Sequence, residues 1–309
     1  MEISIIYVNY FCESLLIDSI TSLISNSFDP KTCEIIISNN GGDLKLLKSK
    51  FPFVIVIQNN QNLGFGKANN IAVKESSCDF IFLLNPDTII TDDCLDKFIS
   101  FYRKNSNKLN IGVLGGEILD INGNHNFSSN YHADCYNDIK YILSSFIGYF
   151  IGSTKKIKFN DSNYKKVDAV IGCNIFMAKK TFNDIDGFDD KFFMYFEDLD
   201  LCRSIFSNLG LISYVIKDVK IIHLEGGASK SIMDKEVKKI KSTTYSMYIK
   251  SLFIYIRKHQ TSNISYFFNR VYFKAIFLLN ILFNGISFRK VFNFNIIEKK
   301  RLIKLIFNS

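Results

Sequence analysis

Short apolar runs alternate with amphipathic stretches along the first third of the chain. Residues 3–8 and 33–38 are typical of buried strands, and the segment between them, ESLLIDSITSLISNS, has apolar positions at helical spacing. Two further runs, FVIVIQ and DFIFLLN, are each followed by a polar loop and a helix-like stretch. This order predicts βαβ units and therefore an α/β fold, with an open, mixed but mainly parallel sheet flanked by helices.

Polar residues directly follow several of these predicted strands. Asn9 and Ser38 lie at two strand ends, a polar loop follows Gln58, and Asp87 follows the fourth run in LLNPDTIITDD. Ligands of open parallel sheets bind at the carboxyl ends of the strands. The pattern therefore predicts a ligand site at this edge of the sheet.

Asp87 has two interpretations. Divalent cations take carboxylate oxygens together with phosphate oxygens, so Asp87 is a candidate metal ligand beside a nucleotide diphosphate. The spacing in NPD fits a DxD-type motif in which Asn85 replaces the first acid. An Asp before Thr is also common in turns and helix caps, and the next helix is expected to start near Thr91, Asp92 and Asp93. The tripeptide alone favours the turn or cap.

The segment NLGFGKANN begins at Asn62 and contains two glycines that open a predicted helix. Gly64 and Gly66 resemble part of a dinucleotide fingerprint, but Asn69 stands at the third glycine, and the chain has no Gly-Lys-Ser/Thr phosphate loop. A nicotinamide or ATP site is therefore disfavoured. The loop can still bring backbone amides and the side chains of Asn69 and Asn70 to a nucleotide at a helix N-terminus. A tight structural turn is the alternative.

The most informative segment is GFDDKFFMYFEDLDLCRS, residues 187–204, in which five acidic residues alternate with five aromatic ones. Apolar surroundings raise the affinity of a carboxylate for a proton, as a general base near neutral pH requires, and Glu197 and Asp198 are the candidates. The alternative is a helix start, where Glu197, Asp198 and Asp200 complement the dipole of a helix that runs through Leu209. Both can hold together, because a helix start is a rigid mount for a base.

A short predicted strand, VKIIH, ends at His223 and precedes the turn HLEGGAS. His223 therefore lies at a further strand end. A lone histidine is more often a structural hydrogen-bonding residue than a ligand.

Composition limits the class of protein. The chain has 309 residues, of which 47% are hydrophobic and 22% charged, as expected for a folded protein with a substantial core. Seven cysteines occur without a CxxC pair, so neither a disulfide framework nor a zinc site is indicated, and a reducing compartment is expected. The N-terminus, MEISIIYVNY, lacks the features of a signal peptide, so we expect a cytoplasmic protein.

The net charge of +8 is concentrated near the C-terminus, in KEVKKIKS, IRKH and IIEKKRLIKLIF. Basic residues alternate there with apolar ones at helical spacing, which favours a helix on a membrane surface over a nucleic-acid surface. Residues 271–288 are nearly enough to span a bilayer, but Lys274, Asn280 and Asn284 interrupt them. Residues 231–309 are predicted to form a basic, amphipathic, membrane-associated helical region, with a buried helix pair as the alternative.

Taken together, these motifs resemble one family. The succession NLGFGKANN, LLNPDT, GCNIFMAKK, DGFDDKFFMYFEDLDLC and HLEGGAS is similar to the family 2 glycosyltransferases, in particular their rhamnosyltransferase-like branch. The resemblance implies a GT-A (Rossmann-like) fold over residues 1–230, with a nucleotide-binding half at 1–100 and an acceptor and catalytic half at 101–230. It also implies inverting transfer of a sugar from a nucleoside diphosphate sugar to an acceptor hydroxyl, with Mg²⁺ or Mn²⁺.

The resemblance assigns roles to individual positions. Asp87 matches the metal-binding acid, and His223 matches the histidine that reaches the metal or the diphosphate. Asp198 matches the general base, while Glu197 would orient the acceptor or the base. The donor is expected to contact the following residues: Val8, Asn9, Tyr10, Ser38, Asn40, Asn62, Gly64, Asn69, Asn70, Asn85 and Asp87.

Two positions depart from the family pattern. The family's second strand usually ends in Asp-Asn-x-Ser, and the Asp reads the pyrimidine, whereas Ser38 stands in that place here. Asn39, Asn40 or Asp43 would have to substitute for it. The Arg that commonly follows the last acid by four residues falls at three, as Arg203, and no role is assigned to it.

The predicted activity is an inverting glycosyl transfer, with L-rhamnose from dTDP-rhamnose indicated by the branch. The basic tail fits a lipid-linked saccharide acceptor at the cytoplasmic face of the cell membrane, as in O-antigen or capsule assembly, with the protein peripheral to that membrane. Nucleic acid is not an expected partner, and a homo-oligomer is left open. A sugar nucleotidyltransferase would need a glycine-rich triphosphate loop in place of YVNYFCES. A non-catalytic nucleotide-sugar-binding or scaffold protein is the other alternative.

Overall fold

The computed structural model describes residues 2–130, 159, 162–224, 237–259 and 296–308, together with single positions between 263 and 278. The chain divides into two compact units. Unit 1 contains Met1–His132, Lys155–Phe193 and Glu197–Ile232, and unit 2 contains Ala133–Thr154, Met194–Phe196 and Met233–Ser309. Every predicted site residue belongs to unit 1. The division of residues 1–230 into a nucleotide half and an acceptor half stays a prediction.

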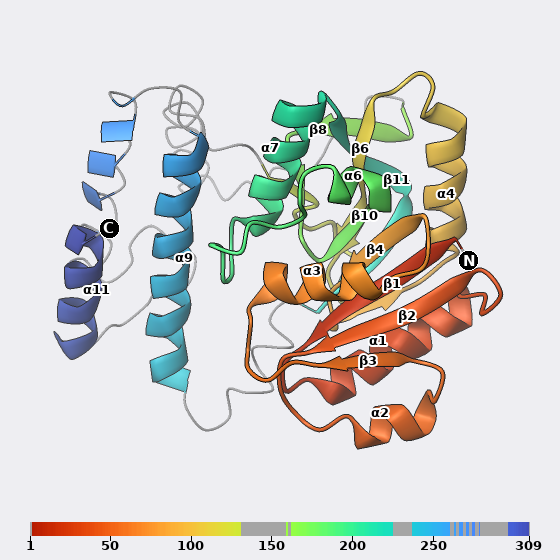
Figure 1. Ribbon diagram of the computed structural model, residues 1–309, viewed down its shortest axis with the longest axis horizontal. Coiled ribbons are helices and arrows are strands. Elements are labelled where there is room, and N and C mark those ends of the chain that lie inside the picture. The colour runs from red at the N-terminus through yellow and green to blue at the C-terminus, as the bar shows by residue number, and fades with distance from the viewer. Residues whose placement is uncertain are drawn as a thin grey trace. The chain divides into compact units, whose positions relative to one another are not determined.

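Unit 1 is built on one sheet, which has nine strands within the described residues (Figure 1). These strands are β1 (Ile3–Asn9), β2 (Cys33–Asn39), β3 (Ile55–Gln58), β4 (Phe80–Leu84), β5 (Thr88–Ile90), β6 (Ile111–Leu119), β8 (Tyr164–Val167), β10 (Asn174–Ala178) and β11 (Ile212–His223). Their order is β3-β2-β1-β4-β10-β6-β11-β5, and β8 pairs with β11. The short strands β7 (Ser129–Asn130) and β9 (Ala169–Val170) form a separate pair.

The sheet is mainly parallel, as predicted. Strands β3, β2, β1 and β4 are parallel neighbours. Strand β10 is antiparallel to both β4 and β6, so β6 points the same way as β4, and β11 is parallel to β6. Six of the nine described strands (β3, β2, β1, β4, β6 and β11) therefore share one direction and end at one edge. The predicted strand VKIIH is only the last part of β11, which begins at Ile212.

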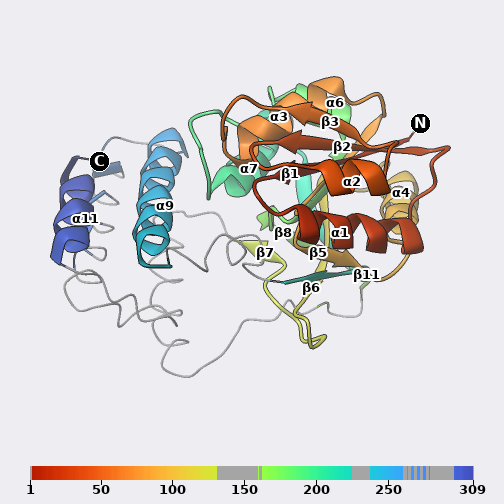
Figure 2. The ribbon, with the colours of Figure 1, turned by 90° about the horizontal axis from the view of Figure 1, so that it is seen from below.

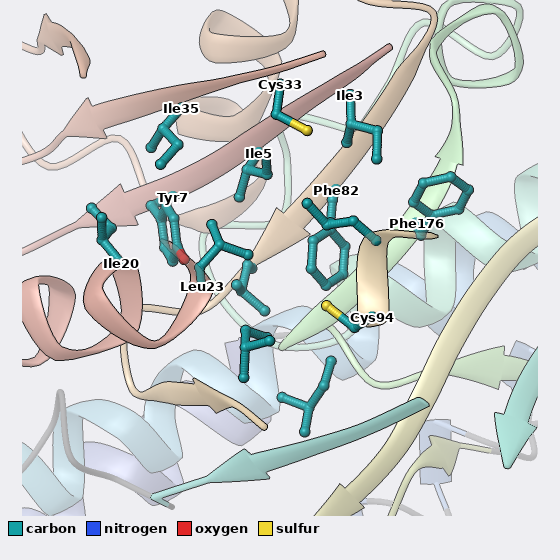
Figure 3. Packing of buried hydrophobic residues seen from close by; sticks show 14 of the residues in the cluster. Ile3, Ile5, Tyr7, Ile20, Leu23, Cys33, Ile35, Phe82, Cys94 and Phe176 are labelled. Atoms are coloured by element: carbon teal, nitrogen blue, oxygen red, sulfur yellow. The ribbon is translucent and has the colours of Figure 1, made fainter. Parts of the chain in front are cut away.

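Helices cover both faces of this sheet, as predicted. They are α1 (Glu13–Asn26), α2 (Lys45–Lys50), α3 (Phe65–Glu75), α4 (Cys94–Asn105), α6 (Lys179–Asn183) and α7 (Glu197–Leu209). Figure 2 shows α3 on one side of β1 and β2, and α1 on the other. One apolar cluster joins α1 and α4 to the sheet, and Ile5, Tyr7 and Phe82 lie at its centre (Figure 3). Burial of these side chains supplies most of the free energy that holds the layers together.

A run of aromatic rings fixes β4, the strand that leads to Asp87. The ring of Phe176 on β10 stacks against Phe80 and Phe98, at centroid distances of 5.3 and 5.0 Å. Phe98 on α4 also contacts Phe82, at 5.4 Å. Stacked pairs of this kind contribute about 0.5–1.5 kcal/mol each beyond their buried area. The run therefore holds β4, β10 and α4 in one rigid body.

Unit 2 contains α9 (Val237–His259) and α11 (Ile296–Asn308), in the region where basic helices were predicted. The two helices share an apolar cluster to which α9 gives Ile249, Leu252, Phe253 and Ile256, and α11 gives Leu302 and Ile306. Within the described residues, no helix has an apolar stretch long enough to cross a bilayer. Most of the predicted interrupted segment, 271–288, lies outside the described residues.

Candidate active site

Asparagine side chains join the ends of the first three strands. Nδ2 of Asn9 donates to Oδ1 of Asn39 at 2.7 Å. Nδ2 of Asn59 donates to Oγ of Ser38 at 2.8 Å and to Oδ1 of Asn40 at 2.9 Å. All five side chains are buried. Three predicted donor-binding residues therefore meet here and fix the shape of the edge, together with Asn39 and Asn59. Contact with a donor stays a prediction.

Two exposed aromatic rings stand at the tip of β1. Tyr10 and Phe11 are 39% and 58% exposed, and their rings meet edge to face at 4.9 Å. Phe11 has a φ of +52°, and its N–H donates to the carbonyl oxygen of Gly41 at 3.0 Å. Val8 is half-buried next to them. Tyr10 and Val8 were predicted donor contacts, whereas Phe11 was not, because its left-handed backbone cannot be read from the local pattern of residues.

The two glycines before α3 allow a distant loop to pack against it. The N–H of Phe65 donates to the carbonyl oxygen of Phe193 at 3.1 Å. A Cβ on Gly64 would lie 2.2 Å from that oxygen, and one on Gly66 would lie 2.8 Å from Cβ of Phe188. The NLGFG segment therefore packs directly against the loop 187–193, and this loop precedes the predicted base in the chain. Such close packing is what the alternative interpretation of this segment, a tight structural turn, requires.

The asparagines of the same segment also bind protein groups. Oδ1 of Asn70 accepts from the N–H of Phe188 at 2.9 Å, and its Nδ2 donates to the carbonyl oxygen of Phe188 at 2.8 Å. Nδ2 of Asn69 donates to the carbonyl oxygen four residues earlier. Oδ1 of Asn62 accepts from the N–H of Gly64. Asn70 thus ties α3 to the loop of acids, and a role for these three side chains in donor binding stays a prediction.

Asp87 and His223 lie side by side. Nε2 of His223 is 3.2 Å from Oδ1 of Asp87, and Asp87 is buried. His223 pairs with Thr88 where β11 meets β5. Asp87 lies in the turn between β4 and β5, as one predicted alternative had it, but it is not a helix cap, because α4 begins only at Cys94. The fold therefore brings the two predicted metal ligands together.

The chemistry of this pair fits a divalent cation that is shared with a substrate. Carboxylate oxygen and imidazole nitrogen are both ligands of Mn²⁺, and Mg²⁺ is commonly held by one or two protein carboxylates plus phosphate oxygens. In the part of the chain that the structure describes, no three His, Cys, Asp or Glu side chains form a metal-binding group. The pair thus suits a cation whose remaining ligands are a diphosphate and water, and does not form a closed protein cage.

The predicted base lies at the start of α7, where Glu197 and Asp198 follow each other. Oδ2 of Asp198 accepts from the N–H of Gly172 at 2.9 Å, and Oδ1 accepts from the N–H of Leu199 at 2.8 Å. Burial raises the pKa of both carboxyls, that of Glu197 to about 8, and the charge of Asp198 adds to the shift in Glu197. Oε2 of Glu197 is buried without a hydrogen-bond partner among the described residues. The two interpretations of this segment, a helix start and a pair of carboxyls with raised proton affinity, therefore both hold.

A two-residue loop connects the base to the metal-ligand candidates. The N–H of Asn85 donates to the carbonyl oxygen of Cys173 at 3.0 Å, and the preceding residue, Gly172, donates to Asp198. Burial, and to a smaller extent the charges of Asp87 and Asp198, raise the pKa of the Cys173 thiol to about 12. Both carboxylates are therefore near one buried thiol. The motif GCNIFMAKK was recognised in the sequence, but this role of its first two residues was missed.

Comparison with known proteins agrees with this geometry. Residues 4–185 match the family model for glycosyl transferase family 2. The chain belongs to the family 2 glycosyltransferases. Rhamnosyltransferase WbbL of Escherichia coli strain K12 is 28% identical over 211 residues, which are 65% of this chain and 73% of the relative. The minor teichoic acid biosynthesis protein GgaB of Bacillus subtilis strain 168 is 24% identical over 59% of this chain, but over only 22% of its own length.

Solved structures share the fold of this glycosyltransferase. S. aureus TarS 1-349 aligns with a TM-score of 0.54 and 16% identity over 90% of this chain and 80% of its own. Its complex with UDP-GlcNAc aligns with a TM-score of 0.55 and 14% identity over 83% and 81%. GalNAc-T7 with UDP, GalNAc and Mn²⁺ has a TM-score of 0.53 and 14% identity over 72% and 43%. The predicted GT-A fold and family are confirmed.

Gly64→Ala is expected to destabilise the protein more than Gly123→Ala. Both glycines have left-handed φ values, +81° and +77°, so alanine costs about 1–2 kcal/mol at either position. At Gly64 the new Cβ would also clash with the carbonyl oxygen of Phe193, whereas nothing lies within 4 Å of a Cβ on Gly123. Urea unfolding should show an additional loss of roughly 2 kcal/mol for Gly64→Ala. Equal losses for the two variants would contradict this packing.

Glu197→Gln is expected to change how stability depends on pH. With a folded-state pKa of about 8 against an ordinary 4.5, the folded protein keeps a proton on Glu197 that the unfolded chain loses. This contribution to stability is complete below pH 4.5 and is lost as the pH rises through 8. A neutral glutamine does not incur this loss.

The free energy of unfolding of Glu197→Gln, relative to wild type, should therefore rise between pH 4.5 and 8. We expect a rise on the order of 2–4 kcal/mol in chemical denaturation. Glu75→Gln, at an exposed position on α3, is the control and should show no such rise. A Glu197 variant that parallels the control across this range would show that the buried carboxyl is ionised throughout.

Proposed function

We propose that this glycosyltransferase inverts configuration at the anomeric carbon as it moves a sugar from a nucleoside diphosphate donor to a hydroxyl of a lipid-linked saccharide. The observation that carries the proposal is the loop of Gly172 and Cys173, whose two backbone groups hold Asp198 and the loop of Asp87 at one edge of the sheet. A base and a diphosphate site at one edge are what a single displacement requires.

Asp198 is the general base of the proposed reaction. Each of its oxygens accepts one backbone N–H, which leaves lone pairs for the hydroxyl of the acceptor. Asp198 takes the hydroxyl proton as that oxygen forms the new bond to the anomeric carbon, and the bond from this carbon to the diphosphate oxygen breaks. The apolar burial that raises the pKa of Asp198 strengthens it as a proton acceptor. Glu197 orients the acceptor or the base from the adjacent position.

Asp87 and His223 would hold Mg²⁺ or Mn²⁺ with the diphosphate of the donor. When bound, such a cation stabilises the negative charge that develops on the leaving diphosphate. The backbone bond between Asn85 and Cys173 keeps this loop beside the base. The presence of Mn²⁺ in the GalNAc-T7 structure supports the cation.

The donor nucleotide is proposed to lie over the ends of β1, β2 and β3. Tyr10 and Phe11 offer exposed rings on which a base can stack, and the asparagine side chains form a polar floor. Ser38 accepts a hydrogen bond from Asn59, and its uncharged hydroxyl does not supply the negative charge of the family's pyrimidine-reading carboxylate. The TarS complexes with UDP and UDP-GlcNAc support a nucleotide sugar, and the likeness to WbbL supports L-rhamnose from dTDP-rhamnose.

Unit 2 supports an anionic, lipid-linked acceptor and a peripheral place on the inner face of the cell membrane. A cavity of about 590 Å³ in this unit is lined by Lys250, Arg257, Arg301 and Lys304 together with Phe253, Ile254, Tyr266 and Leu305. The sequences of α9 and α11 contain a single acid, Glu298. Cations beside apolar side chains match the phosphate and the hydrocarbon of a lipid carrier. O-antigen or capsule assembly is the pathway proposed.

Asp198→Asn is expected to abolish turnover while donor binding persists. Removal of a general base lowers kcat by roughly 10²–10⁴-fold, whereas the amide keeps the size of the side chain. Asp87→Asn should instead remove the metal-dependent thermal shift that the donor produces. Asp218→Asn, an exposed acid on β11, is the control for both. Turnover by Asp198→Asn at the wild-type rate would overturn the role of Asp198 as the base. A wild type that binds donor but transfers nothing to any acceptor would instead favour the non-catalytic alternative.

Replacement of three cations of the unit 2 cavity should weaken binding to anionic membranes. We expect Lys250→Gln, Arg257→Gln and Lys304→Gln together to reduce affinity for phosphatidylglycerol vesicles roughly 100-fold at low salt, at about 1 kcal/mol per charge. Vesicle sedimentation measures this. The same charge change at exposed Lys48, Lys104 and Lys108 of unit 1 is the control. Equal losses from both sets would contradict a localised lipid site.

A further inference from the structure

The three residues before the catalytic acids belong to a different unit from their neighbours. Met194–Phe196, called the MYF segment below, clusters with unit 2, although Phe193 and Glu197 on either side belong to unit 1. The chain thus leaves unit 1 for three residues immediately before it enters α7. No sequence pattern predicted that these three residues group with unit 2.

The MYF segment has a costly backbone conformation. Tyr195 and Phe196 have φ values of +71° and +66°, so two consecutive residues with side chains are left-handed. Each such residue costs about 1–2 kcal/mol and persists only where the surroundings impose it. Strain of this kind concentrates at functional sites. Something outside the segment must therefore hold this conformation.

Helix α9 supplies the contacts that hold it. Oγ of Ser251 donates to the carbonyl oxygen of Met194 at 2.7 Å. The ring of Tyr248 lies 5.8 Å from that of Tyr195 and 5.0 Å from that of Phe196, and Tyr255 packs on Phe196 at 5.6 Å. Tyr248, Ser251 and Tyr255 are spaced three and four residues apart, so they lie on one face of α9.

These contacts are rigid because two of the three side chains that make them are buried. Ser251 and Tyr255 are 3% and 0% exposed, so water does not compete for the bond to Met194 or for the ring contacts. At the other end, the carbonyl oxygen of Phe193 accepts from the N–H of Phe65 in unit 1. The MYF segment is therefore held by α9, and the residue that precedes it is held by Phe65.

We propose that Tyr248, Ser251 and Tyr255 are positioning residues for glycosyl transfer. By holding the MYF segment left-handed, they set the orientation of Glu197 and Asp198, which follow it directly. A displacement of about 1 Å in a reacting group can cost on the order of 100-fold in rate, so this support is part of the catalytic apparatus. The inference rests on the proposed role of Asp198 as base. It gives the C-terminal region a function in the reaction that is separate from membrane binding.

The test compares paired variants of α9. Ser251→Ala and Tyr248→Leu remove the bond and the ring contacts, and each should lower kcat at least 10-fold while the KM for the donor stays within about 2-fold. The limb of the pH–kcat profile that reports the base should shift as well, because Asp198 changes its surroundings. Ser251→Thr keeps the hydroxyl and Tyr248→Phe keeps the ring, so both should restore kcat and the profile.

Leu302→Ala is the matched control for stability. Leu302 is buried in the same apolar cluster of unit 2, on α11, and its loss should lower the melting temperature at least as much as the α9 variants do. Assayed well below that temperature, it should keep its kcat. A kcat loss in Leu302→Ala equal to that in Ser251→Ala, or wild-type kcat in both Ser251→Ala and Tyr248→Leu, would overturn the positioning role. A wild type without transfer activity would instead overturn the proposed function on which it rests.

Discussion

The hydrogen bond from the N–H of Gly172 to Asp198 is the contact on which the site depends. It joins the start of α7 to the loop before β10, and the next residue of that loop, Cys173, accepts from Asn85 beside Asp87. A Cβ on Gly172 would lie 3.4 Å from Oδ2 of Asp198, an ordinary van der Waals distance, so the contact depends on the backbone N–H of this residue. One short loop thereby sets the separation of two carboxylates that are far apart in the sequence.

This arrangement places a cost on stability. Glu197 and Asp198 are adjacent, largely withdrawn from water and of like charge, and burial raises the pKa of both. A raised pKa weakens the folded state as the pH rises, but it also makes the ionised carboxylate a stronger proton acceptor, as a general base requires. Stacked aromatic rings on β4, β10 and α4 contribute stability elsewhere in unit 1 that offsets part of this cost.

Helix α9 combines two kinds of surface in unit 2. Its residues Lys250 and Arg257 line the basic cavity, and Tyr248, Ser251 and Tyr255 contact the MYF segment. The same part of α9 therefore contains both the proposed lipid-binding cations and the residues proposed to position the base.

The sequence by itself determined the sheet, the family and the acids, because hydrophobic periodicity encodes burial and the motifs retain their order along the chain. It identified Asp87, Glu197, Asp198 and His223 as chemistry-bearing residues, yet it left a turn or a helix cap as the alternative for Asp87. Only the tertiary structure excluded the cap. It alone also revealed the use of Asn70 and the glycines for packing, the contact between Gly172 and Asp198, and the strained MYF segment. These features arise from backbone angles and from contacts between residues distant in sequence, and a local pattern of residue types specifies neither.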